Sequence, residues 1–175
     1  TMLQGGYSQS ALPRSSTPNN CFAVYQEVLL LNIAILDDSK EDLWQIKSVI
    51  SSYYESRNTS ADIRLYSSAE SFFAKYSPGF YDLIIMDIYM GTMTGMDAAR
   101  KLRDAKDTAA LIFITSSDAY AVESYDVQAS YYLLKPFDPE KLCRILSTIQ
   151  FRQSQNSRYI ELISDRTPVK IPVRS

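Results

Sequence analysis

The stretch Tyr81-Asp-Leu-Ile-Ile-Met-Asp87 decides the fold that we predict for this chain. Its four consecutive apolar residues, 83–86, predict a strand that is covered on both faces, as in the interior of a parallel sheet. Asp87 follows at once, and residues 88–95 then form a glycine-containing loop. Asp87 is therefore expected at the carboxyl edge of a sheet, where open α/β sheets bind ligands. Alternatively, it only caps the loop, as many aspartates do.

Length and composition are those of an ordinary globular protein. The 175 residues are 46% hydrophobic and 22% charged, which suits one domain with additional segments. The formal net charge of −2 argues against binding nucleic acid through an overall positive field. The sequence contains no histidine, which excludes Ser-His and Cys-His catalysis and His-ligated zinc within this chain.

The cysteines and the hydropathy of the chain indicate its cellular compartment. Cys21 and Cys143 lie far apart and match the free thiols of a reducing compartment. The longest apolar run, 28–36, contains Asn32 and is too short to span a bilayer. Residues 1–20 lack the pattern of a secretory signal. We therefore expect a cytoplasmic protein that has no membrane segment.

Signals for strands and helices alternate along the central part of the chain. Apolar runs predict strands at 30–36, 63–66, 83–86, 110–114 and 131–134. Capping residues and helical stripes predict helices after Ser39, at 67–76, at 96–104, at 119–127 and from Pro139. This alternation predicts a flavodoxin-like (βα)5 fold, a doubly wound α/β parallel sheet with strand order 2-1-3-4-5.

The segments outside this pattern divide the chain into parts. Residues 1–27 begin with a Ser-, Gly-, Pro- and Asn-rich stretch and are expected to be a disordered leader or an extension introduced by cloning. Residues 28–151 form the main domain, and 152–157 are a polar linker. Residues 158–175 match two strands joined by a turn, which we interpret as the incomplete start of a second domain.

Polar residues gather at the predicted strand ends. Asp37-Asp38 follow the first strand, Asp87 the third, Thr115 the fourth and Lys135 the fifth. Each alone could merely cap a helix or a turn. Together, three carboxylates at one edge would repel unless a cation neutralised them, and Mg²⁺ prefers such oxygen ligands. A lysine and a hydroxyl can bind phosphoryl oxygens, and a carboxylate can accept the phosphoryl group. The sequence therefore predicts Mg²⁺-dependent phosphoryl transfer.

Over about residues 30–151 the chain resembles the receiver domain of two-component response regulators. The resemblance is carried by Asp37-Asp38, Met86-Asp87-Ile88 with Gly95 following, Thr115-Ser116, and Tyr132-Leu-Leu-Lys-Pro-Phe137. It implies that 28–151 is a receiver, a signalling domain rather than an enzyme, and that its phosphoryl donor is a sensor histidine kinase.

The same resemblance implies a role for each site residue. Asp87 would be the phosphoacceptor, and Lys135 would contact the phosphoryl group. Asp38 would be a direct Mg²⁺ ligand, and Asp37 would hold the metal through water. Asp87 and the backbone carbonyl of Tyr89 would complete the protein ligands.

Thr115 and Tyr132 would form the switch pair of such a receiver. Their movement would repack a face made by the fourth helix (119–127), the fifth strand (131–134) and the fifth helix, through which the family commonly forms homodimers. The family also implies a cis peptide bond at Lys135-Pro136. One departure is Gly91, where the family often has proline.

Two further segments resemble the LytTR family of transcriptional regulators. They are Tyr120-Ala-Val-Glu-Ser-Tyr125 with Ala129, and Arg158-Tyr-Ile-Glu-Leu-Ile163. The second resembles the first strand of a LytTR DNA-binding domain. This implies a truncated transcriptional regulator that would bind DNA only through the missing effector domain.

Three alternatives remain at this stage. A haloacid-dehalogenase-type phosphatase also uses a strand-end aspartate, but it needs a second acid two residues later, where this chain has Tyr89. An FMN carrier needs a Ser/Thr/Gly-rich phosphate loop after the first strand, where this chain has Asp37-Asp38. A pseudo-receiver would act through protein contacts without being phosphorylated.

Overall fold

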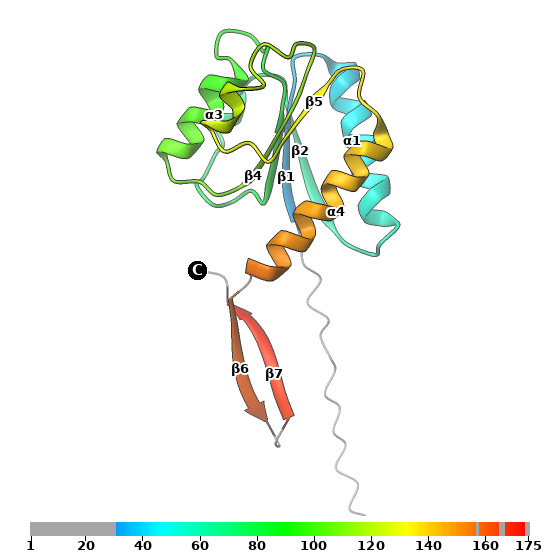
Figure 1. The fold of residues 1–175 in the computed structure, drawn as a ribbon, viewed down its shortest axis with the longest axis vertical. Coiled ribbons are helices and arrows are strands. Elements are labelled where there is room, and N and C mark those ends of the chain that lie inside the picture. The colour runs from blue at the N-terminus through cyan, green and yellow to red at the C-terminus, as the bar shows by residue number, and fades with distance from the viewer. Residues whose placement is uncertain (1–30, 157, 165–166, 174–175) are drawn as a thin grey trace, which may run out of the picture.

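The computed structural model of the protein describes residues 31–156, 158–164 and 167–173. Five strands form one fully parallel sheet in the order β2-β1-β3-β4-β5, as Figure 1 shows. The strands are β1 (Leu31–Leu36), β2 (Ala61–Tyr66), β3 (Leu83–Met86), β4 (Ala110–Thr115) and β5 (Tyr131–Leu134). The predicted strand order 2-1-3-4-5 and the flavodoxin-like α/β fold are thereby confirmed.

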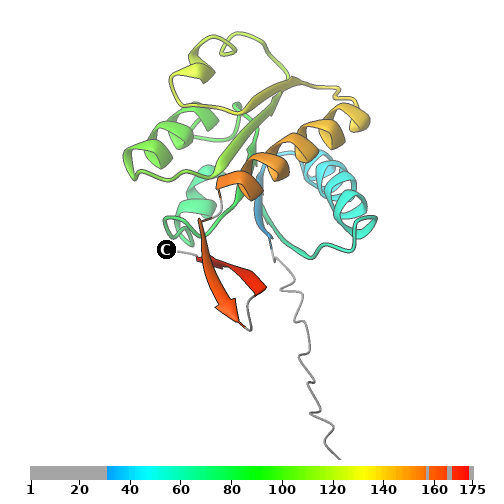
Figure 2. The same cartoon turned by 60° about the horizontal axis from the view of Figure 1, so that its bottom comes forward.

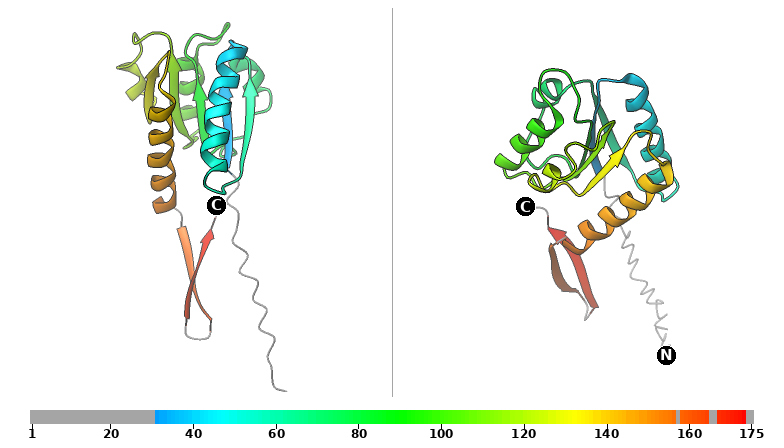
Figure 3. Two further views of the ribbon diagram at one scale, coloured as in Figure 1. Left: turned by 90° about the vertical axis from the view of Figure 1, so that its right-hand side faces the viewer. Right: turned by 45° about the horizontal axis from the view of Figure 1, so that its top comes forward.

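Helices cover both faces of this sheet, so the domain has three layers (Figures 1 and 2). The helices α1 (Lys40–Glu55) and α4 (Pro139–Asn156) lie on one face and contact each other (Figure 3, left). The opposite face carries α2 (Ala69–Phe73) and α3 (Gly95–Asp104). Helices on both faces are what right-handed crossovers between parallel strands produce.

The strands alternate between the two cores because successive side chains of a strand point to opposite faces. Ile33 and Ile35 of β1 pack with α1 and α4, whereas Ala34 and Leu36 pack with α2 and α3. In β3, all four residues are buried. A strand apolar on both faces explains why the run that ends at Asp87 is continuous rather than alternating.

Local capping begins the helices largely as predicted. Ser39 caps α1, and its hydroxyl accepts a hydrogen bond from the Asp42 amide at 3.3 Å. The prediction for α2 is wrong in its bounds. Its N-cap is Ser68 rather than Ser67, and the helix ends at Phe73 rather than near Tyr76. The Ser68 hydroxyl accepts a hydrogen bond from the Ser71 amide at 3.1 Å, so the cap is shifted by one residue.

The helix predicted at 119–127 is reduced to a single 3-10 turn, η1 (Glu123–Tyr125). Most backbone hydrogen bonds here span three residues, as in Ala121 N to Asp118 O and Gln128 N to Tyr125 O. The Ser124 hydroxyl donates to the Ala121 carbonyl at 2.6 Å, and such local side-chain bonds compete with a regular helix. The segment is also too short to gain much from helical cooperativity.

The C-terminal part forms the predicted hairpin. The strands β6 (Arg158–Ser164) and β7 (Thr167–Val173) pair antiparallel. The helix α4 extends through Asn156, so most of the predicted linker 152–157 is helical, and residue 157 lies outside the described residues. The leader 1–27, including Cys21, also lies outside them, whereas Cys143 is a free, partly buried thiol. Within the described residues, no helix is long and apolar enough to cross a membrane.

Candidate functional site

The carboxyl ends of four strands bring the predicted site residues to one edge of the sheet. Leu36 of β1 is in register with Met86 of β3, so the residues that follow them, Asp37 and Asp87, are neighbours. Their backbones are joined there, since the Asp87 amide donates to the Leu36 carbonyl at 2.9 Å. The Lys135 amide likewise donates to the Thr115 carbonyl at 2.8 Å, which joins the ends of β5 and β4.

Three carboxylates form a compact cluster at the ends of β1 and β3. One oxygen each of Asp37, Asp38 and Asp87 lies within 4.8 Å of the others. Asp37 and Asp87 are buried, whereas Asp38 is exposed. Carboxylate oxygens at this spacing, one of them open to solvent, are the donor set that a hard divalent cation takes together with water. The donors present therefore fit the divalent metal that the sequence predicts.

Lys135 joins the acids at the centre of the site. Its ammonium group lies 2.7 Å from Asp37 Oδ2, 2.7 Å from Asp42 Oδ2 and 2.9 Å from Asp87 Oδ2. Burial by itself would lower the pKa of Lys135, but these three charged hydrogen bonds outweigh it and raise the pKa above its ordinary value. Lys135 is therefore a fixed positive charge.

The two buried aspartates are held by both of their oxygens. Asp37 Oδ1 accepts from the Ser39 amide at 2.9 Å while its Oδ2 accepts from Lys135. Asp87 Oδ1 accepts from the Tyr89 amide at 3.2 Å while its Oδ2 accepts from Lys135. Burial raises the pKa of Asp37, and the bonds from Lys135 and Ser39 oppose that rise. Both carboxylates thus have fixed orientations.

Gly95 holds the loop after β3 close to Asp87. A Cβ at this position would lie 2.2 Å from the Asp87 carbonyl oxygen and 2.9 Å from the Ile88 Cα. The Gly95 amide donates to the Ile88 carbonyl at 2.8 Å, and Thr94 caps the helix α3 that begins here. Only glycine allows this close approach of two backbones.

Thr115, at the end of β4, carries an unsatisfied hydroxyl. Its Oγ1 is fully buried and has no hydrogen-bond partner among the described residues. An unpaired buried hydroxyl costs free energy, and such groups are rare in native proteins. The hydroxyl is therefore available to bond a group that enters the site.

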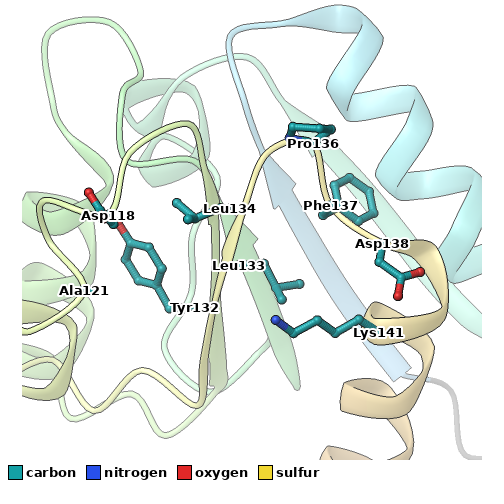
Figure 4. A pocket seen from close by; sticks show the side chains of 9 residues that line it. All are labelled: Asp118, Ala121, Tyr132, Leu133, Leu134, Pro136, Phe137, Asp138 and Lys141. Atoms are coloured by element: carbon teal, nitrogen blue, oxygen red, sulfur yellow. The ribbon is translucent and has the colours of Figure 1, made fainter.

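Tyr132 lies in β5, an edge strand of the sheet. Its hydroxyl donates to the Ser117 carbonyl at 2.5 Å, and its ring contacts Phe113 with the centroids 6.0 Å apart. Burial raises the pKa of this phenol. Beside it, β5 and the start of α4 line a hollow of about 450 Å³, in which Leu134 and Lys141 also take part (Figure 4).

The structure thus brings most of the predicted site residues together and adds one residue that was not predicted. Asp42 is a third partner of Lys135, and it was not among the site residues predicted from the sequence. The signal that could have found it is an acid in the first turn of the helix that starts directly after Asp37-Asp38. Tyr89 contributes its amide to Asp87, and its half-exposed ring packs edge-on against Tyr120 at 6.1 Å. The role of its carbonyl stays a prediction, as do the roles of the other site residues.

Comparison with known proteins agrees with this geometry. The model of the response regulator receiver domain family matches residues 33–147, so the chain belongs to that family. Among curated relatives, the sensory transduction protein LytR of Staphylococcus haemolyticus is 33% identical over 84 residues, covering 48% of this chain and 32% of the relative. The response regulator ArlR of Staphylococcus aureus is 38% identical over 77 residues, covering 43% and 35%. The matches thus span about a third of these relatives' length.

Solved structures support the fold. The response regulatory domain of mrkE from Klebsiella pneumoniae superposes with a TM-score of 0.63 at 18% identity, over 72% of this chain and all of that domain. TrrA of Thermotoga maritima, solved in complex with Mg(2+)-BeF, gives a TM-score of 0.59 at 24% identity, over 68% of this chain and 98% of that one. This fold agrees with the family match, which makes the chain a response regulator receiver domain, a family that is generally signalling rather than catalytic.

Proposed function

We propose that this chain accepts a phosphoryl group on Asp87 from a sensor histidine kinase and thereby controls an attached DNA-binding effector. The observation that carries the proposal is the Lys135 ammonium group, bonded to Asp87 at 2.9 Å and to Asp37 at 2.7 Å. A lysine that contacts both the proposed acceptor and its acidic neighbour is well placed to bind the oxygens of a phosphoryl group at that position.

The proposed reaction uses the side chains as they lie. An oxygen of Asp87 attacks the phosphorus of phosphohistidine, the new P–O bond forms an acyl phosphate, and the P–N bond breaks with its electron pair returning to the imidazole. The Asp87 side chain is only 7% exposed, and both of its carboxylate oxygens are already oriented by hydrogen bonds. Lys135 can donate to the phosphoryl oxygens, and the unpaired Thr115 hydroxyl can donate to another.

We further propose Mg²⁺ as the cation of the three-acid cluster. Asp38 would bind it directly, Asp37 would hold it through water, and Asp87 with the Tyr89 carbonyl would complete the protein ligands. When bound, the metal would neutralise charge on the phosphoryl oxygens. The spacing of the three carboxylates within 4.8 Å supports this assignment.

The proposed response is a shift between two packings of the switch pair. Thr115 would turn toward the phosphoryl group, and Tyr132 would repack beside it. The face that would change consists of η1, β5 and α4, which we propose as the homodimer interface. Val122 is 81% exposed, Tyr125 80% and Leu134 47%, so apolar side chains are available there for a partner.

The wider assignment also remains a proposal. It comprises a receiver at 28–151, a linker at 152–157, and the start of a LytTR-type DNA-binding domain at 158–175. The hairpin formed by β6 and β7 is consistent with such a start. A histidine kinase and DNA as partners would place the protein in the cytoplasm.

Incubation with Mg²⁺ and acetyl phosphate, followed by intact mass spectrometry, tests this function. The wild type should gain the mass of one phosphoryl group, and both the Asp87→Asn variant and a chelator-treated sample should not. Absence of any gain would favour a pseudo-receiver. A gain that Asp87→Asn retains would move the acceptor elsewhere, and steady hydrolysis of a phosphomonoester would favour a phosphatase.

A further inference from the structure

The third partner of Lys135 has no role in the proposed reaction. The ammonium group has three donors, and Asp37, Asp42 and Asp87 take all of them at 2.7, 2.7 and 2.9 Å. The Lys135 side chain is only 17% exposed, so little water can compete for these donors. Any phosphoryl oxygen that binds Lys135 must therefore replace one of three carboxylates.

Asp42 differs from the other two acids in its position. Asp37 and Asp87 are 0% and 7% exposed in their side chains and belong to the three-acid cluster, whereas Asp42 is 30% exposed and lies outside that cluster. It lies in the first turn of α1, where its amide donates a hydrogen bond to the Ser39 hydroxyl. The Ser39 amide in turn donates to the Asp37 carboxylate. The start of the helix thus fixes Asp42 relative to the acid cluster.

The charge of Asp42 changes what Lys135 does to that cluster. Without Asp42, the ammonium charge would be compensated only by Asp37 and Asp87, which are two of the three groups available to a divalent cation. A cation entering there is repelled by the ammonium, and a carboxylate 2.7 Å from the nitrogen offsets that repulsion. Asp42 therefore favours the cation.

We propose that Asp42 is a positioning residue that acts through Lys135. It neutralises the ammonium and draws it toward α1, which leaves the Asp37–Asp87 pair more open to a divalent cation. It also competes with an incoming phosphoryl group for the same ammonium, a part of the inference that rests on the proposed function. Loss of the Asp42 charge should thus weaken cation binding and strengthen the reaction with an anionic donor.

The variants Asp42→Asn, Asp42→Glu and Glu41→Gln of the full chain separate charge from position. Glu41 is the exposed neighbour in the same first helical turn, so Glu41→Gln removes the same charge and the same helix-terminal effect. By titration calorimetry with Mg²⁺, Asp42→Asn should bind about threefold to tenfold more weakly than wild type. The Mg²⁺ affinities of Glu41→Gln and Asp42→Glu should both stay within about twofold of wild type. The first variant leaves the contacts of Lys135 intact, and the second keeps the negative charge beside it.

The second measurement is the acetyl phosphate concentration that gives half-maximal phosphorylation at saturating Mg²⁺. For Asp42→Asn it should fall about threefold. A structural defect would weaken both reactions, so the opposite signs identify the proposed role. Unchanged Mg²⁺ affinity in Asp42→Asn, an equal loss in Glu41→Gln or Asp42→Glu, or parallel weakening of both reactions would each overturn the inference. If no variant and no wild type is phosphorylated, the proposed function fails, while the Mg²⁺ titration still decides the effect of Asp42 on the cation.

Discussion

The two halves of the carboxyl edge of the sheet are built in opposite ways. In the acid half, at the ends of β1 and β3, both oxygens of Asp37 and of Asp87 accept hydrogen bonds. The other half, at the ends of β4 and β5, carries the proposed switch pair and is named the switch half after it. There the buried Thr115 hydroxyl has no partner in the described part of the chain. The segment 118–130 that follows it contains one 3-10 turn in place of a helix.

The difference follows from the cost of burial. An unpaired buried charge costs a large part of the free energy that stabilises a domain. The buried acids and Lys135 must therefore be paired, and pairing fixes their positions. An unpaired hydroxyl costs only about 1–3 kcal/mol, which a stable domain tolerates. In the proposed function, the acid half would orient the reaction, and the switch half would rearrange in response to it.

The largest expected effect breaks the acid half at Gly95. Gly95→Ala would place a Cβ 2.2 Å from the Asp87 carbonyl oxygen, a contact with backbone that cannot move aside. We expect the free energy of unfolding in urea to fall by about 3 kcal/mol. Gly79→Ala is the control, since nothing lies within 4 Å of its Cβ. Its positive φ should cost about 1–2 kcal/mol. Equal losses in the two variants would refute the steric argument.

The next effect breaks the switch half at its anchor. Arg103 of α3 donates to the carbonyls of Val127 at 2.8 Å and Asp107 at 2.7 Å, which ties the end of the segment 118–130 to the domain. Arg103→Met should lower the free energy of unfolding by about 2–3 kcal/mol, because partly buried carbonyls lose their partners. Hydrogen exchange of the amides at 118–130 should also become faster.

The matched control for that variant is one helical turn away. Arg100 makes exposed ion pairs with Asp97 and Glu123, at 3.2 and 3.4 Å. Arg100→Met should change stability by less than about 0.5 kcal/mol. If it destabilises as much as Arg103→Met, surface charge rather than the carbonyl bonds holds the segment.

A smaller effect, with the opposite sign, sharpens the comparison at Thr115. Thr115→Val replaces the unpaired buried hydroxyl by a methyl group of similar shape. We expect the free energy of unfolding to rise by about 1–2 kcal/mol. Thr115→Ser keeps the hydroxyl and should not be stabilised. A loss of stability in the valine variant would show that the hydroxyl is paired in solution.

The smallest effect concerns the hydrogen bond that holds Tyr132, the proposed switch tyrosine. Tyr132→Phe removes the hydroxyl that donates to the Ser117 carbonyl at 2.5 Å. Thermal unfolding should show a loss of about 1 kcal/mol. Tyr125→Phe, in a residue that is 80% exposed, should leave the melting temperature unchanged. A larger loss from Tyr125 than from Tyr132 would contradict this account of the switch half.

Sequence patterns predicted the acid half better than the switch half, for a physical reason. The strands that precede Asp37 and Asp87 are buried on both faces, and a continuous apolar run is a strong local signal. The cis bond at Lys135-Pro136, which follows β5, was implied by the family resemblance rather than by a sequence pattern, and it is present. The segment 119–127 has no continuous apolar run. Its weak helical pattern competes with local side-chain hydrogen bonds, such as the one that the Ser124 hydroxyl donates to the Ala121 carbonyl.

By itself, the sequence determined the order of the strands and of most helices, the fold class, and which polar residues lie at the ends of the strands. These depend on periodicity and on residues close in the chain. Only the tertiary structure decided that Lys135 pairs with Asp42, 93 positions away, and that the Thr115 hydroxyl is left without a partner among the described residues. The sequence shows an acid in the first turn of α1, but its pairing depends on where side chains from separate elements lie in space, which periodicity does not determine.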